Sequence, residues 1–400
     1  MTQPTTQSRA QHLLVVVGIV VLAFNLRPAA VSVGPVLPEV RAGLGMTPTV
    51  AGVLTTLPVL AFATVGAAAP VLARRAGVHR VTLAALGAVV AGLGLRAVVD
   101  SPLPFLALSV VGLSGMATAN VLLPSLVKLH FPQRVGLLTS LYTTSLAVGL
   151  TMASALTVPV SEGLGSWRWG LGAWAVTALV AAVPWLGLLR HDLAPDDQPH
   201  TVTLAQVART RLGWAMAVLF GLQSLQAYSI FGWLPQVYRD AGFAPGTAGL
   251  LLGVVTGMSI PLSFLLPSVA ARMRHQGALV TALTACYPLG YLGLVLAPVA
   301  GAWVWAVLVG VGASVFPVVL TLIGLRSRTP GGTAALSGFT QSVGYLIAAT
   351  GPFGVGLLYD VAGSWTPPLL VLAGLAVPQI GLGLLASRAR FVEDELRAPV

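Results

Sequence analysis

A few polar side chains interrupt long apolar segments of this chain, and they can donate hydrogen bonds or positive charge. Arg27 stands about fourteen residues into the first such segment, which at 1.5 Å per helical residue is close to the middle of a bilayer. A charge at that depth costs at least ~2.5 kcal/mol and usually faces a cavity or a partner. Pro28 also frees a backbone carbonyl nearby. We favour contact between Arg27 and an anionic or strongly dipolar ligand over a purely structural role.

Further candidates for ligand binding place an amide or a hydroxyl inside an apolar segment. They are Asn25, Asn120, Tyr142, Gln223, Gln226, Gln341 and Tyr345. Such groups in hydrocarbon bond either a ligand or a neighbouring helix. We favour the ligand for Gln226, Gln341 and Tyr345, and both roles remain open for Asn120. Together with Arg27, these residues form the predicted substrate-binding site.

Residues suited to catalysis or metal binding do not occur deep in the apolar segments. The acidic residues nearest to them fall at or beyond segment ends, and they are Glu39, Asp100, Glu162, Asp240 and Asp360. None of the six His lies deep in a segment, and the single Cys286 excludes a thiolate cluster. A membrane enzyme would need carboxylates or His there, and a sensor would need a soluble output domain. We therefore predict no enzyme, no catalytic or metal site and no cofactor.

The composition excludes a soluble globular protein. Only 8% of the 400 residues are charged and 56% are hydrophobic, whereas soluble chains have about 25% charged residues. Long apolar runs separated by short polar ones predict membrane-spanning helices rather than a barrel. The net charge of +10 is dispersed in ones and twos, so no nucleic acid partner is predicted. The expected partners are the lipid bilayer and a small-molecule substrate, with the protein acting as a monomer.

Windows of about 20 apolar residues predict twelve spans. They cover residues 13–38, 48–71, 81–99, 103–127, 136–159, 167–189, 213–236, 246–269, 277–298, 302–325, 334–358 and 365–386. Sixteen Lys and Arg residues fall at the termini and even-numbered connections, three fall on the other side, and Arg27 and Arg96 lie within spans, which accounts for all 21. This bias predicts a multi-pass cell (inner) membrane protein with both termini cytoplasmic. Arg96, near a span end, is expected to extend to the membrane surface.

An internal repeat relates the two halves of the chain. Leu37 to Leu54 matches Leu234 to Leu251 without gaps at an offset of 197 residues, and Gly165-Ser166-Trp167 returns as Gly363-Ser364-Trp365. Six predicted spans separate the copies, so both copies enter the membrane in the same direction. We predict an all-α polytopic membrane protein with twelve transmembrane helices in two parallel-repeat halves. The six-helix halves are residues 1–189 and 213–400, and residues 190–212 form a cytoplasmic linker.

Several short motifs resemble those of the major facilitator superfamily, and within it those of the cyanate and 2-nitroimidazole permease family. They are Asn25-Leu26-Arg27-Pro28, Gly34-Pro35-Val36-Leu37-Pro38, Leu54-Thr55-Thr56-Leu57-Pro58, Asn120-Val121-Leu122-Leu123-Pro124, Trp233-Leu234-Pro235, Leu336-Ser337-Gly338 and Gln341-Ser342-Val343-Gly344-Tyr345. One motif departs from the pattern. Where facilitators commonly carry Gly-x-x-x-Asp-Arg-x-Gly-Arg-Arg, this chain has Arg74 at the acidic position.

The resemblance implies a transporter that works by alternating access around a midplane cavity. The leading expectation is movement of a small anionic or strongly dipolar, cyanate-like solute. The alternative is an exporter of neutral nitroheterocyclic or other amphipathic compounds, with Arg27 donating to a nitro group. The departure at Arg74 makes an Asp-based gating contact in that loop doubtful.

Overall fold

The computed structural model describes residues 9–46, 48–189 and 202–397, and all their regular secondary structure is helical. Residues 190–201 of the predicted linker lie outside the described residues. Eleven described helical segments are long and apolar enough to cross a membrane, two of them (Thr247–Arg272 and Ala302–Leu325) with an internal interruption, and the apolar stretch His12–Asn25 is shorter. The chain forms two compact units, and the first ten residues of the long helix α7 (Val135–Gly163) group with the second.

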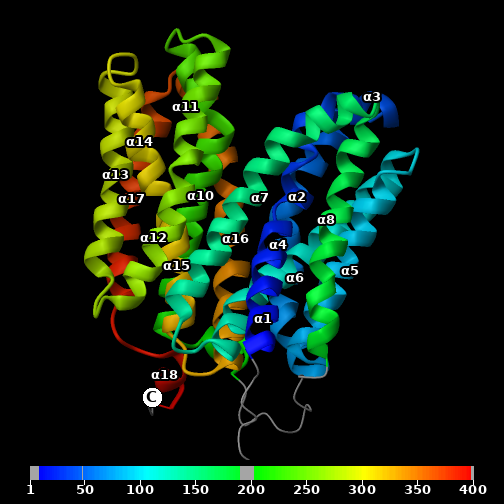
Figure 1. Ribbon diagram of the computed structural model, residues 1–400. Coiled ribbons are helices and arrows are strands. Elements are labelled where there is room, and N and C mark those ends of the chain that lie inside the picture. Colours follow the sequence, from blue (N-terminus) through cyan, green and yellow to red (C-terminus); the bar gives the residue numbers. More distant parts are fainter. Residues whose placement is uncertain (1–8, 47, 190–201, 398–400) are drawn as a thin grey trace, which may run out of the picture. The chain divides into compact units, whose positions relative to one another are not determined.

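The first unit holds the remainder of α7 and all the helices that precede it (Figure 1). Its other elements are α1 (Arg9–Asn25), α2 (Pro28–Val31), the 3-10 turn η1 (Gly34–Val36), α3 (Leu37–Leu44), α4 (Pro48–Ala76), α5 (Val78–Arg96), α6 (Pro102–His130) and α8 (Trp167–Leu188). Helix α6 packs against α1, α2, α4 and α5, and α8 packs against α1 and α5. Most of α6 is buried, so it forms the centre of this unit.

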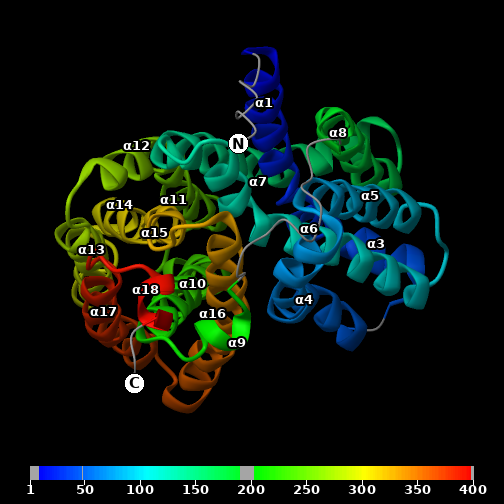
Figure 2. The ribbon, with the colours of Figure 1, turned by 90° about the horizontal axis from the view of Figure 1, so that it is seen from below.

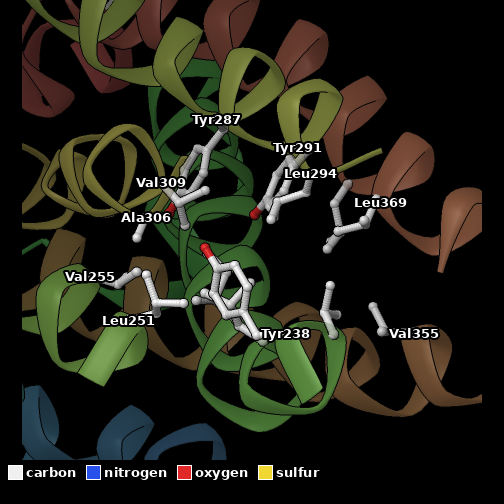
Figure 3. Packing of buried hydrophobic residues seen from close by; sticks show 14 of the residues in the cluster. Tyr238, Leu251, Val255, Tyr287, Tyr291, Leu294, Ala306, Val309, Val355 and Leu369 are labelled. Atoms are coloured by element: carbon white, nitrogen blue, oxygen red, sulfur yellow. The ribbon is translucent and has the colours of Figure 1, made fainter. Parts of the chain in front are cut away.

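The second unit is built around α10 (Arg211–Asp240). Its other helices are α9 (Leu204–Val207), α11 (Pro245–Gly257), α12 (Ser259–Arg272), α13 (Gly277–Leu296), α14 (Ala302–Ala313), α15 (Val315–Leu325), α16 (Pro330–Ala362), α17 (Thr366–Ala386) and α18 (Val392–Arg397). Seen end-on in Figure 2, α10 lies among α11 and α14–α17, all of which it contacts. The buried core of this unit includes Tyr238, Tyr287 and Tyr291 (Figure 3).

Three of the predicted spans are interrupted within their length. The first stops at Asn25, the eighth is divided after Gly257 and the tenth is divided after Ala313. Each interruption lies just before a proline: Pro28, Pro261 or Pro317. Proline has no N–H, so the carbonyl four residues earlier loses its helical donor. Proline alone does not force a break, because α6 runs through Pro124.

The short helix α18 holds together the ends of two longer helices in the second unit. Buried Glu393 accepts hydrogen bonds from the backbone N–H groups of Arg328, at 3.0 Å, and Thr329, at 3.1 Å, where α16 begins. Glu395 accepts from the Leu212 N–H at the start of α10, at 3.1 Å. Asp394 instead forms an exposed ion pair with Arg328, and these hydrogen bonds raise the pKa of the guanidinium. The acidic side chains thus satisfy donors that helix starts leave open.

Replacing Glu393 by Ala should lower the melting temperature of the protein, because buried backbone donors lose a charged acceptor, at a cost of about 1–3 kcal/mol. Asp394→Ala is the matched control, and it should have a smaller effect because the Asp394–Arg328 pair is exposed. Thermal unfolding of the detergent-purified variants measures both. Equal melting temperatures for the two variants would contradict this assignment of roles in α18.

Candidate functional site

Arg27 lies at the interruption between α1 and α2, where the backbone leaves regular helix geometry. It occupies the N-cap position of α2 and is half-buried. The Leu26 N–H bonds the Ala23 carbonyl at 3.2 Å, and the Arg27 carbonyl accepts from Ala30 at 3.0 Å. The Arg27 side chain is therefore carried by a turn within the apolar part of the sequence, and this turn lies between α1 and the short helix α2.

Two contacts from a neighbouring helix hold this interruption in place. The Ser145 hydroxyl of α7 donates to the Val20 carbonyl of α1 at 2.7 Å. Gly149, one turn further along α7, lies directly against the carbonyl oxygen of Phe24, which is the carbonyl that Pro28 deprives of its donor. A side chain at Gly149 would overlap that oxygen. The close approach of α7 thus depends on a glycine at this position.

The two asparagines of the first unit have different surroundings. Asn25 is buried, its amide donates to the Val21 carbonyl at 2.8 Å, and its oxygen accepts from Thr177 of α8 at 2.7 Å. Asn25 therefore joins α1 to α8. Asn120 is buried in the middle of α6, and Pro124 removes the usual donor to its backbone carbonyl. Helix α6 contacts α2, the segment that follows Arg27.

In the second unit, Gln223 and Gln226 of α10 form a buried chain of amides with Gln379 of α17. Gln226 Nε2 donates to Gln379 Oε1 at 2.8 Å, and Gln379 Nε2 donates to Gln223 Oε1 at 2.7 Å. Gln223 Nε2 in turn donates to the Ala313 carbonyl at 2.8 Å and to the Tyr287 hydroxyl at 3.2 Å. Gln223 and Gln226 thus form their hydrogen bonds within the helix bundle of their own unit.

The position of this amide chain follows from the interruption between α14 and α15. Ala313 is the residue whose carbonyl loses its helical donor to Pro317, and Gln223 supplies a replacement. The sequence analysis missed Gln379 as the link between the other two amides. Gln379 is an amide inside the last apolar segment, and this could have identified it, because a buried amide needs hydrogen-bond partners.

The remaining predicted site residues of the second unit lie on α16 and α7. Gln341 is buried and donates to the Ser337 hydroxyl at 2.8 Å on the same face of α16. Tyr345, one turn later, packs edge-on against Phe220 of α10 with ring centroids 5.1 Å apart. Tyr142 is buried on the part of α7 that groups with the second unit. No observation tests whether these side chains contact a substrate, and that role stays a prediction.

The prediction that Arg96 reaches the membrane surface is wrong. Arg96 is 1% exposed and donates to the hydroxyls of Ser32, at 3.1 Å, and Ser109, at 3.5 Å. Its guanidinium also lies over the Phe105 ring, 5.8 Å from the centroid. The Arg96 side chain points into the unit although it is close to a span end, because hydroxyl and aromatic partners are available there.

The acidic residues that neighbour the spans lie at helix ends or beyond them, as predicted. Glu39 is exposed in the first turn of α3, Glu162 is in the last turn of α7, Asp240 ends α10 and Asp360 is in the last turn of α16. Asp100 lies in the connection between α5 and α6. Over residues 9–46, 48–189 and 202–397, no three His, Cys, Asp or Glu side chains are grouped to hold a metal ion.

Comparison with known proteins gives consistent matches over nearly the whole chain. A family model described as Major Facilitator Superfamily matches residues 13–352. The uncharacterized transporter YycB of Bacillus subtilis (strain 168) is 37% identical, over 96% of each chain. The 2-nitroimidazole transporter of Escherichia coli (strain K12) is 33% identical, over 97% of this chain and 99% of the relative. The cyanate transport protein CynX of the same organism is 28% identical, over 90% and 94%.

Among solved structures, a crystal structure of the E. coli fucose:proton symporter FucP superimposes with a TM-score of 0.75. The match covers 95% of this chain and 99% of FucP at 13% sequence identity. At this level of identity the likeness concerns the fold, and it confirms the predicted all-α multi-pass architecture.

Gly149→Ala should destabilise the first unit, because the added methyl group meets the Phe24 carbonyl and forces α7 away from α1. We expect a loss of about 1–3 kcal/mol and a lower melting temperature. Gly87→Ala on α5 is the control, because a Cβ at Gly87 meets nothing within 4 Å. That change should be neutral or slightly stabilising. An unchanged melting temperature for Gly149→Ala would show that α7 does not need this close approach.

Proposed function

Because this chain belongs to the major facilitator superfamily, we propose that it carries a small anionic or strongly dipolar solute across the cell membrane by alternating access. The chain is a multi-pass membrane transporter, as the family match and the structural likeness show. Our proposal adds the class of solute, cytoplasmic termini and action as a monomer. The parts that move would be residues 1–189 and 213–400, with residues 190–212 as the cytoplasmic linker between them.

The observation that carries the proposal is the half-buried guanidinium of Arg27 at the interruption of α1. A guanidinium is planar, keeps its charge and can donate two parallel hydrogen bonds to two acceptor atoms. It is placed by a proline-induced turn, and Ser145 and Gly149 of α7 support that turn. A rigid support of this kind reduces the entropy lost when a solute binds.

The named relatives support the same chemistry. One is a cyanate transport protein and another is a 2-nitroimidazole transporter. Cyanate is an anion, and a nitro group places partial negative charge on two oxygens, so a guanidinium suits both. We propose that Arg27 donates hydrogen bonds to such a group and that Asn120, also in the first unit, contributes a further contact to the solute. Gln223, Gln226, Gln341, Tyr345, Asn25 and Tyr142 remain predicted contributors.

A second candidate function is export of neutral nitroheterocyclic compounds. It is favoured by the higher identity to the 2-nitroimidazole transporter, 33% against 28% for the cyanate transport protein. The two candidates differ in the charge of the solute, and only the second specifies the direction of transport. Competition between cyanate and 2-nitroimidazole for binding to the purified protein would rank the two classes.

Arg27→Ala should raise the dissociation constant of the solute at least about tenfold, because a charge-assisted hydrogen-bonding group is worth roughly 1.5–3 kcal/mol. Arg27→Lys should restore little, because an ammonium does not reproduce the planar fork. Binding of cyanate and 2-nitroimidazole to purified variants, together with uptake into proteoliposomes, measures the effect.

The control for this experiment is Arg239→Ala, which removes an exposed arginine near the outer end of α10. This variant should bind the solute as wild type does. Wild-type affinity in correctly folded Arg27→Ala would overturn the proposed role of Arg27.

Transport should also proceed without a carboxylate relay through the helices. Asp, Glu and His chains are the usual proton carriers inside membranes, and the described acids near the spans lie at helix ends or in the connections between helices. Glu39 is the one to test, since its repeat counterpart is the neutral Gln236. We expect any accumulation of cyanate driven by a pH gradient to disappear in Glu39→Gln.

The measurement is cyanate uptake into proteoliposomes with and without an imposed pH gradient, because cyanate stays anionic near neutral pH. Glu162→Gln, at the end of α7, is the matched control and should behave as wild type. Gradient-driven accumulation that survives the loss of Glu39 would mean that protons cross by another route.

A further inference from the structure

The buried guanidinium of Arg96 is joined to the segment that follows Arg27. Arg96 Nη2 donates to the Ser32 hydroxyl at 3.1 Å, and both residues are buried. Ser32 comes directly after α2, and its own N–H bonds the Pro28 carbonyl at 3.1 Å. The end of α5 is therefore tied to the far end of the short helix that begins at Arg27.

Helix α2 depends on such outside contacts to keep its position. It has only four residues, and most helical stability in proteins comes from packing against other elements. The Arg27 carbonyl accepts from the N–H groups of Ala30, at 3.0 Å, and Val31, at 3.1 Å. A displacement of Ser32 is therefore passed to Arg27 through one turn of hydrogen-bonded backbone.

The contacts from α7 support the other side of this turn. Ser145 and Gly149 meet backbone carbonyls of α1, which precedes Arg27 in the chain. They hold the chain before Arg27, whereas the hydrogen bond between Ser32 and Arg96 holds the chain after it. The turn that carries the Arg27 side chain is thus fixed from both sides.

The internal repeat indicates that the fold itself does not need a buried charge at this place. Helix α5 is the third span of the first half, and α13 is the third span of the second half. None of the residues Gly277–Leu296 of α13 is charged. A buried charge costs stability because it loses its hydration. A buried arginine in α5 but not in α13 therefore indicates a role that belongs to the first unit.

We propose that Arg96 is a positioning residue for solute binding, which holds Ser32 and thereby fixes, through α2, the direction of the Arg27 side chain. This inference rests on the proposed role of Arg27 in binding the solute. Without the bond to Ser32, the Arg27 side chain has more freedom to lose when the solute binds. Ordering one such side chain weakens affinity about two- to tenfold. In this role Arg96 acts through α2 rather than by touching the solute.

The test begins with solute-free protein in lipid, labelled with 13C and 15N in its arginines. Solid-state NMR records the guanidinium signal of Arg27, which is assigned by its absence in Arg27→Lys. Ser32→Ala should shift or broaden this signal, because α2 loses its tie to α5. Ser109→Ala is the matched control, because Ser109 accepts from Arg96 at 3.5 Å but lies on α6. This control should leave the Arg27 signal as in wild type.

Arg96→Met tests the other partner of the hydrogen bond. This variant should fold, because replacing a buried charge by an apolar side chain is often neutral or stabilising. It should change the Arg27 signal as Ser32→Ala does, and the double variant should change it no further, because both changes remove the same contact. An Arg27 signal that is unchanged in Ser32→Ala, equally changed in Ser109→Ala, or additively changed in the double variant would overturn the proposal.

Solute affinity separates this proposal from the proposed function. Binding of cyanate and 2-nitroimidazole to the purified variants should weaken about two- to tenfold in Ser32→Ala and stay at the wild-type value in Ser109→Ala. A changed Arg27 signal with wild-type affinity would contradict the binding role of Arg27, while the link from Arg96 to Arg27 would stand. Weakened affinity with an unchanged Arg27 signal would overturn the positioning role of Arg96.

Discussion

Every backbone carbonyl inside a membrane needs a hydrogen-bond donor from the protein or from a water-lined cavity, and prolines remove such donors. In this chain helices are interrupted just before Pro28, Pro261 and Pro317. Gly149 lets α7 close on the Phe24 carbonyl, and the Gln223 amide bonds the Ala313 carbonyl. The same constraint thus produces the turn that carries Arg27 and the amide chain of the second unit.

The two units consequently offer different chemistry. The first presents a half-buried guanidinium at a supported turn, with a second arginine, Arg96, fully buried among hydroxyls and an aromatic ring. The second binds its amides to one another through Gln379.

The sequence predicted the features that depend on composition and local rules. The helical class and the approximate number of membrane spans follow from apolar segment length, and the positions of the acids at or beyond helix ends follow from the cost of burying charge. It did not predict the bonds of Gln223 and Gln226, because these depend on which faces of α10 and α17 meet. The prediction that Arg96 extends to the membrane surface failed for a similar reason, because its hydrogen-bond partners Ser32 and Ser109 belong to other elements of the unit. The prolines alone do not predict which helices are interrupted, because α6 continues through Pro124 without a break.

The central claim is that the Arg27 guanidinium contacts the transported solute. Solid-state NMR can test this contact directly in protein with 15N-labelled arginine and bound 13C-labelled cyanate or 2-nitroimidazole, by measuring dipolar dephasing of the solute carbon by guanidinium nitrogen. We predict strong dephasing in wild type and its loss in Arg27→Lys, in which any residual solute has no guanidinium at that position. A bound solute that shows no dephasing in wild type, or the same dephasing in Arg27→Lys, would contradict the claim.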